Sequence, residues 1–270
     1  MATLLKPDPT FYPSPRLAAE APPETLAYMV TFDPTGSSPD ALVTVDVDPQ
    51  SKTYRQAVNT LSMPNTGDEL HHFGWNACSS ALCPYAPHPH IERRYLLLPG
   101  LRSSNIYVFD TKPDARSPKL VHTITAAEIA DRAGYSRPHT IHCGPDGIYI
   151  SALGAPDGGP PGGIFIVDHD TFTVKGRWEL DRGPQQLAYD FWWHLGYDTA
   201  ITSEWAPRRW SRGASTPRSC SPVDTATRST SGTSPSGATA RSSTSAPSSR
   251  WSSSSGRPMI PPRPTGSSAW

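Results

Sequence analysis

Short apolar runs separated by turn residues form the main pattern over the first two thirds of the chain. β-Branched and aromatic residues gather between Gly, Pro, Asp and Asn, which is typical of strands. We expect strands at residues 41–47, 94–99, 105–110, 119–124, 147–153, 163–168 and 172–180. Many short strands at close spacing predict an all-β protein.

One segment has the pattern of a helix. Thr125 precedes the run AAEIADRA, and Glu128 stands three residues after it, which is the spacing of a capping box. Gly134 follows the run and can adopt the left-handed conformation that closes a helix. The sequence therefore predicts one helix between Thr125 and Gly134.

The order strand, Asp, turn, strand recurs along the chain. Residues 168–171 join two of the expected strands, and a longer loop with two prolines follows the strand that ends at Asp110. A recurring hairpin favours the blades of a β-propeller, in which each sheet packs against its neighbours around a channel. Composition alone gives equal weight to a β-sandwich with insertions, so both architectures stay open at this point.

Prolines are frequent in the first forty residues. They interrupt regular structure and favour an extended path along the surface. We therefore interpret residues 1–40 as a proline-rich extended segment that precedes the folded part at residues 41–207. The prolines concerned are Pro7, Pro9, Pro13, Pro15, Pro22 and Pro23.

The charge balance changes at Pro207. Residues 1–207 hold 15 Lys and Arg against 23 Asp and Glu, whereas residues 208–270 hold nine Arg and one Asp. The net charge of the chain is therefore zero because an acidic part and a basic part cancel. An acidic body argues against nucleic-acid binding through phosphate neutralisation, and the arginines of residues 208–270 are too dispersed to form a basic stripe.

No apolar run approaches the roughly 20 residues that a membrane-spanning helix needs, and no signal-peptide pattern follows Met1. Four cysteines in 270 residues are too few for a disulfide scaffold. We therefore expect a cytoplasmic protein that binds neither membranes nor nucleic acid.

Two pairs of histidines have spacings that are relevant to metal binding. His71 and His72 lie in DELHHFGWNACSS, and His139 and His142 lie in RPHTIHC. Imidazole is the commonest ligand for transition metals, and the affinity of such sites for divalent metals peaks at copper. Neighbours on a regular strand point to opposite faces, so His71 and His72 can share one metal only from an irregular loop. His139 and His142 diverge on an ideal strand, which predicts that one is a ligand and the other structural.

Each of these features also has a simpler explanation. Taken alone, a His-His dipeptide, or a His-x-x-His outside a helix, more often occurs by chance at the surface or in the core than as part of a metal site. The spacing of Cys78 and Cys83 is weak evidence for a zinc site, and two thiols without a function explain it as well. Asp68 and Glu69 can orient an imidazole as hydrogen-bond acceptors, although an exposed acidic turn explains them equally.

Seven segments follow one another in the order found in a known family, the selenium-binding proteins. The chain resembles this family, whose bacterial members include copper-dependent methanethiol oxidases, over roughly residues 20–207. That stretch is somewhat under half of a full-length member. The segments are LVTVDVDP at 42–49, LSMPNTGDELHHFGWNACSS at 61–80, LLLPGLRSSNIYVFDT at 96–111, HTIHC at 139–143, GGIFIVDHDTFTVKGRWE at 162–179, YDFWW at 189–193 and ITSEWAP at 201–207.

The resemblance implies a partial seven-bladed β-propeller of about three blades with a histidine-bound copper. It also implies a small thiol substrate, with methanethiol, O2 and water converted to formaldehyde, hydrogen sulfide and hydrogen peroxide. His71, His72 and His139 fall on the metal-ligand motifs of the family, with His142 as a further candidate. At least one more family histidine lies in a C-terminal half that has no counterpart in this sequence. Some bacterial relatives are exported.

The alternative function within the family is selenium or metal binding without turnover. Cys78 matches a family cysteine and is the candidate residue for selenium or a thiol. Arg55 stands where animal members have a cysteine associated with selenium, so the resemblance does not support selenium binding at that position.

Residues 208–270 have a composition unlike that of a globular domain. They include 19 serines and contain no Lys, Glu, Gln, Asn, His, Leu, Phe or Tyr. Disordered segments usually favour Lys, Glu and Gln, so disorder alone does not explain their exclusion. Back-translation with the codons started one nucleotide earlier permits a family-like continuation. We therefore interpret these residues as a disordered tail that is read out of frame, and expect the truncated chain to be inactive.

Overall fold

The computed structural model describes residues 15–70, 72–77, 91–144, 146–183, 185–194 and 199–204. Within these residues the chain forms thirteen strands and two helices. The all-β prediction is confirmed. The elements are α1 (Pro15–Glu20), β1 (Leu26–Thr31), β2 (Pro39–Asp46), β3 (Ala57–Thr66), β4 (Gly74–Trp75), β5 (Tyr95–Pro99), β6 (Ile106–Asp110), β7 (Lys119–Ile124), α2 (Ala126–Ala133), β8 (Ser136–Cys143), β9 (Ile148–Gly154), β10 (Gly163–Val167), β11 (Val174–Arg177), β12 (Ala188–His194) and β13 (Thr199–Glu204).

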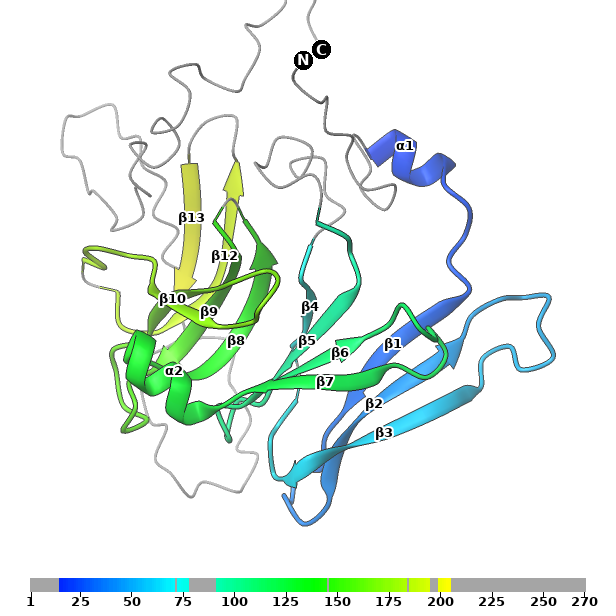
Figure 1. Cartoon of the computed structure of the whole chain (residues 1–270), viewed down its shortest axis with the longest axis horizontal. Helices are drawn as coiled ribbons and strands as arrows, with labels where there is room; N and C mark the ends of the chain where they lie inside the picture. The colour runs from blue at the N-terminus through cyan, green and yellow to red at the C-terminus, as the bar shows by residue number, and fades with distance from the viewer. Residues whose placement is uncertain are drawn as a thin grey trace, which may run out of the picture.

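The strands form four antiparallel sheets that follow the order of the chain. Their strand orders are β1-β2-β3, β4-β5-β6-β7, β8-β9-β10-β11 and β12-β13. The sheets lie side by side like the sectors of a fan, from β1–β3 to β12–β13 (Figure 1). A sandwich would pack two sheets face to face, whereas consecutive meandering sheets in a fan are the arrangement of a propeller. The described part of the chain is therefore a propeller-like fragment.

The two complete sheets are buried on both faces, and alternate residues of each strand serve different interfaces. On β5, Leu97 packs toward the sheet β8–β11, while Leu96 and Leu98 pack toward β1–β3. On β10, Phe165 faces β4–β7 and Ile164 faces β12–β13. Side chains alternate along a strand, so a strand that is buried on both faces must be apolar at successive positions. This requirement explains the unbroken apolar runs LLLP and GIFIV.

An aspartate at the outer end of each of the first three sheets explains the recurring hairpin. Asp46 ends β2, Asp110 ends β6 and Asp168 follows β10. Each carboxylate accepts a hydrogen bond from the backbone N–H two residues later, at 3.0 Å in all three cases. This is an Asx turn, which fixes the start of the connection to the outermost strand. By this correspondence β2, β6 and β10 occupy the same position in successive sheets.

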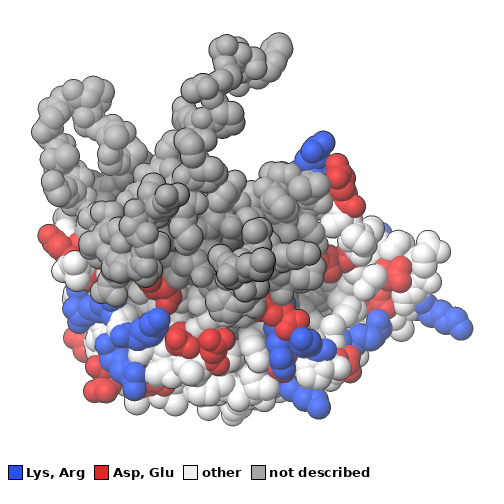
Figure 2. Space-filling model, turned by 45° about the horizontal axis from the view of Figure 1, so that its top comes forward, with Lys and Arg blue, Asp and Glu red and all other residues white. Residues whose placement is uncertain are grey.

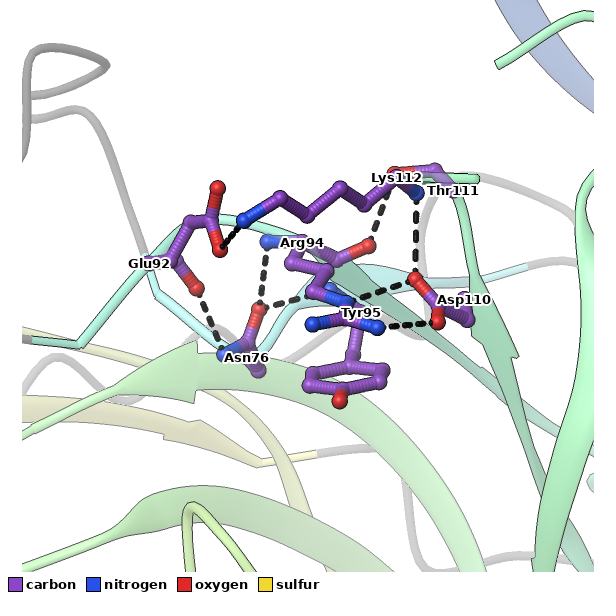
Figure 3. Close-up of polar contacts among 7 residues, drawn as sticks. All are labelled: Asn76, Glu92, Arg94, Tyr95, Asp110, Thr111 and Lys112. Atoms are coloured by element: carbon purple, nitrogen blue, oxygen red, sulfur yellow. Dashed lines mark hydrogen bonds and ion pairs between the residues drawn. The ribbon is translucent and has the colours of Figure 1, made fainter. Parts of the chain in front are cut away.

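The end of the second sheet carries a dense polar network (Figure 3). Arg94 binds Asp110 through two hydrogen bonds, from Nε to Oδ1 at 2.7 Å and from Nη2 to Oδ2 at 2.5 Å. Asn76 accepts the backbone N–H groups of Arg94 and Tyr95 and donates to the carbonyl of Glu92. The Arg94 guanidinium holds the pKa of Asp110 below its usual range, although burial acts in the opposite direction. The network ties β4, β5 and β6 together at one end.

The predicted helix is confirmed with both of its ends. α2 begins after Thr125, whose hydroxyl accepts the Glu128 N–H at 3.2 Å, and Gly134 closes it with a φ of 67°. Gly134 also donates its N–H to the carbonyl of Ala130. Within the described part of the chain, neither helix has the length and apolarity needed to cross a bilayer.

The expectation of an extended, irregular segment over residues 1–40 is wrong for the part that the structure describes. α1 and β1 both lie in it, and β1 pairs with β2 from Leu26↔Asp46 to Thr31↔Ala41. No proline lies between Pro23 and Pro34, so the run LAYMVT keeps all its backbone donors for pairing. Five further strands were not expected from the sequence, namely β3, β4, β8, β12 and β13.

Charged side chains are mixed on the face shown in Figure 2. Acidic and basic groups of the described residues alternate along its edge and do not gather in a patch of one sign.

Candidate functional site

The innermost strands of three successive sheets lie next to one another. β4 opens the second sheet, β8 the third and β12 the fourth, and β8 contacts both β4 and β12. His72 stands just before β4, His139 and His142 lie on β8, and Tyr189 and Asp190 lie on β12. Equivalent strands of neighbouring blades converge toward the propeller axis, so their side chains can form one site.

Three aromatic rings from these strands are in contact. The rings of His72 and His139 have centroids 3.8 Å apart with an angle of 38° between their planes. The ring of Tyr189 lies 4.4 Å from that of His139 and 6.1 Å from that of His72. Residues that are distant in the sequence are thus brought together, and His139 is almost fully buried, with 1% of its surface exposed.

The backbone carbonyl of Tyr189 orients His139. It lies 3.1 Å from His139 Nδ1 and accepts the hydroxyls of Thr140 at 3.1 Å and Ser151 at 2.7 Å. A carbonyl oxygen can only accept, so its hydrogen bond with His139 requires the proton on Nδ1, and the same nitrogen also lies 3.0 Å from the hydroxyl of Thr140. Metal-binding histidines commonly donate their second ring nitrogen in this way, which fixes the tautomer.

His142 has different neighbours from His139. Its Nε2 lies 3.5 Å from Asp190 Oδ1, and its ring meets that of Phe191 edge-on at 5.0 Å. Burial alone would raise the pKa of Asp190, but the contact with His142, the Phe191 N–H and the charges of His142 and His72 lower it. The side chain of His142 is 36% exposed. The two histidines of β8 therefore diverge, with a register irregularity between Pro138 and Ile141.

The acidic residues next to the histidine pair point elsewhere. Asp68 is fully buried and accepts the hydroxyl of Tyr107 at 2.9 and 3.0 Å. Glu69 pairs with Arg102. The acceptor that orients an imidazole is instead the Tyr189 carbonyl, which a sequence does not reveal because every residue has one. Tyr189 and Asp190 were marked in the sequence only as part of the YDFWW segment.

Two of the predicted site residues, His71 and Cys78, lie outside the described residues. Among the residues that the structure describes, no group of three or more His, Cys, Asp or Glu is arranged to hold a metal ion. His72 and His139 nevertheless fit a transition metal in donor chemistry, because both are imidazoles. The metal-ligand assignment of His71, His72, His139 and His142 stays a prediction.

The fan of sheets and the histidines on its innermost strands define a propeller-type protein with a candidate site near the axis. The family model of the 56 kDa selenium-binding protein (SBP56) matches residues 5–219. The chain belongs to this family.

Several relatives show how far the similarity extends. A methanethiol oxidase of Xenopus laevis is 43% identical over 206 residues, which are 75% of this chain and 43% of that protein. Selenium-binding protein 3 of Arabidopsis thaliana is 41% identical over 206 residues. The crystal structure of a hypothetical selenium-binding protein from Sulfolobus tokodaii matches with a TM-score of 0.70 and 56% identity, over 74% of this chain and 44% of that one. The chain therefore spans less than half the length of these relatives.

Proposed function

We propose that this chain supplies part of a histidine-bound copper site of the methanethiol oxidase type. The observation that carries the proposal is the contact between His72 and His139, with His139 held by the Tyr189 carbonyl. His71 joins these two as a ligand in the proposal, and His142 is a further candidate. The names of the animal relatives support the reaction class.

The proposed reaction converts methanethiol, O2 and water into formaldehyde, hydrogen sulfide and hydrogen peroxide. The carbon of methanethiol loses two electrons, and O2 gains them together with two protons to give hydrogen peroxide. Bound copper would supply the redox centre through which thiol and O2 exchange electrons. The protein would contribute orientation, since Tyr189, Thr140 and Ser151 fix the imidazole of His139.

We further propose that the chain does not turn over by itself. Among the described residues only two histidine rings meet at the site, and the chain covers 43% of the methanethiol oxidase of Xenopus laevis. Residues 208–270 are proposed to be an out-of-frame tail, which is supported by their composition. The family match extends to residue 219 and so includes the first 12 of these residues. Resequencing the gene around the codon of Pro207 tests this, and an unbroken frame in independent isolates would contradict it.

Two assays decide between oxidase and binding protein. Copper content and methanethiol-dependent release of peroxide are measured on the 270-residue chain and on a frame-corrected full-length chain. We expect peroxide and sulfide from the copper-loaded, frame-corrected chain and none from the 270-residue chain. Stoichiometric copper without peroxide in the frame-corrected chain would favour metal or selenium binding without turnover, which the names of the Arabidopsis relatives also suggest.

A further inference from the structure

The two outermost sheets of the fan differ from the two middle ones in how their faces are covered. Both faces of β4–β7 and of β8–β11 pack on a neighbouring sheet. The sheets β1–β3 and β12–β13 each contribute one face to a core, and the opposite face carries exposed apolar side chains.

On β12–β13 the exposed face is centred on Trp192 and Ile201. These residues are direct cross-strand partners, and they are 53% and 39% exposed. Phe191, the neighbour of Trp192, is buried against β8–β11, so Trp192 must point to the other side of the sheet. A large aromatic and a β-branched residue paired on an open sheet face have the chemistry of the buried interfaces between the preceding sheets.

On β1–β3 the corresponding face contains Met29, which pairs with Val43 and is 54% exposed. Tyr28 and Val30, on either side of Met29, pack toward β4–β7 instead. The two exposed faces therefore lie at opposite ends of the fan, one on the first sheet and one on the last (Figure 1).

The aspartate turn of the first sheet, and the chain order in the last, show which strands these two sheets contain. Asp46 at the end of β2 corresponds to Asp110 at the end of β6, so β1–β3 correspond to β5–β7, the outer three strands of a blade. No described strand pairs with the free edge of β1, where an innermost strand would lie. β12 and β13 correspond to β8 and β9, the inner two strands of a blade. Both outermost sheets are thus incomplete blades with one open face each.

We propose that these two faces are docking surfaces for one partner, a polypeptide that carries the C-terminal part of a chain of the same family. Such a partner would cover Trp192 and Ile201 with an apolar sheet face and would reach Met29 at the other end of the fan. It would also add a strand to the free edge of β1 by main-chain pairing. The proposal rests on continuity with the three interfaces already present between the four sheets, and on the chain covering only 44% of the Sulfolobus tokodaii protein.

Fragment complementation tests this proposal without reference to copper or turnover. The 270-residue chain is refolded together with the part of the Sulfolobus tokodaii protein that follows its matched region, and each is also refolded alone. Sedimentation gives the stoichiometry, and a fluorescence titration gives the dissociation constant. Ile201→Lys and Met29→Lys place a charge on each proposed surface. Val121→Lys is the matched control, because Val121 is 50% exposed on the outermost strand β7 and lies on neither surface.

We expect a one-to-one complex that Ile201→Lys and Met29→Lys each weaken by about tenfold or more, because a lysine would be buried at an apolar interface. Val121→Lys should leave the affinity unchanged. Absence of a complex, or equal weakening by all three substitutions, would overturn the proposal. A dimer of the 270-residue chain that Ile201→Lys abolishes, and that the fragment does not displace, would assign the surface to a second copy and overturn the choice of partner. The copper proposal can fail without affecting any of these outcomes.

Discussion

The outer and inner ends of the blades use polar residues in opposite ways. At the outer end the same residue recurs, since Asp46, Asp110 and Asp168 all accept the N–H two residues later. At the inner end the residues differ from blade to blade, with His72 in one, His139 and His142 in the next and Tyr189 and Asp190 in the third. A residue that recurs at equivalent positions in successive blades serves the fold, whereas residues that differ among equivalent strands are free to build one asymmetric site.

This comparison predicts that substitutions at the inner end change metal affinity, and that substitutions at the outer end change the free energy of unfolding. The largest effect is expected for His139→Ala, which should lower copper affinity by about a hundredfold or more, since losing a ligand exceeds the tenfold to hundredfold effects of its supporting groups. Copper titration against a competing chelator measures this. His122→Ala is the control, because His122 is an exposed histidine on β7. Equal affinities of the two variants would remove His139 from the site.

Asp110→Asn should have the second largest effect, a loss of about 2 kcal/mol in the free energy of unfolding, because it breaks the paired hydrogen bonds with Arg94. Arg94 lowers the pKa of Asp110, so this stabilisation is present above the unfolded pKa of about 4 and is lost as pH falls through the folded value. Denaturant unfolding at pH 7 and at pH 3 should therefore show a difference between wild type and variant that shrinks in acid.

Glu92→Gln is the matched control for Asp110→Asn. Glu92 pairs with Lys112 at 2.8 Å in the same network, but both side chains are largely exposed (Figure 3). An exposed pair contributes little, so the free energy of unfolding should hardly change. A loss as large as that of Asp110→Asn would mean that the network, and not the buried pair, stabilises this end of the blade.

Ser151→Ala tests whether the orientation of His139 matters. Ser151 donates to the same Tyr189 carbonyl as His139, so its loss should loosen that acceptor and lower copper affinity by about tenfold. Ser136→Ala is the control, because Ser136 lies on β8 as well but donates to the carbonyl of Ala155. Ser151→Ala should lose more stability, because Ser151 also accepts the Thr140 N–H, and only Ser151→Ala should lose copper. Unchanged copper affinity in both variants would show that the Tyr189 carbonyl orients His139 without the hydrogen bond from Ser151.

Sequence patterns predicted the middle sheets well and the inner strands poorly. The runs LLLP and GIFIV are apolar at every position because both of their faces are buried. The strand propensity of their residues therefore agrees with their buried position in the sheet. β8 contains Pro and β12 contains Asp, and such residues have low strand propensity, so a propensity pattern does not reveal these strands.

The same limit applies to the candidate site. The histidines were found from their spacing, but the contact of His72 with His139 depends on the packing of two blades, which no local pattern encodes. The Tyr189 carbonyl could not be predicted at all, since its role depends on where the backbone of β12 runs past β8.

The smallest effect is expected at an exposed aspartate turn. Asp168 accepts the N–H groups of Asp170 and Thr171, each at 3.0 Å, and its pKa is lowered by these contacts, the Thr171 N–H first. Asp168→Ala should cost about 1 kcal/mol in the free energy of unfolding, since water can replace part of what is lost. Asp170→Ala, at the neighbouring exposed acidic residue, should be neutral. If both variants leave stability unchanged and proteolysis finds the hairpin intact, β10 and β11 pair without the aspartate turn. Stability would then not explain why aspartate recurs at the outer ends of the sheets.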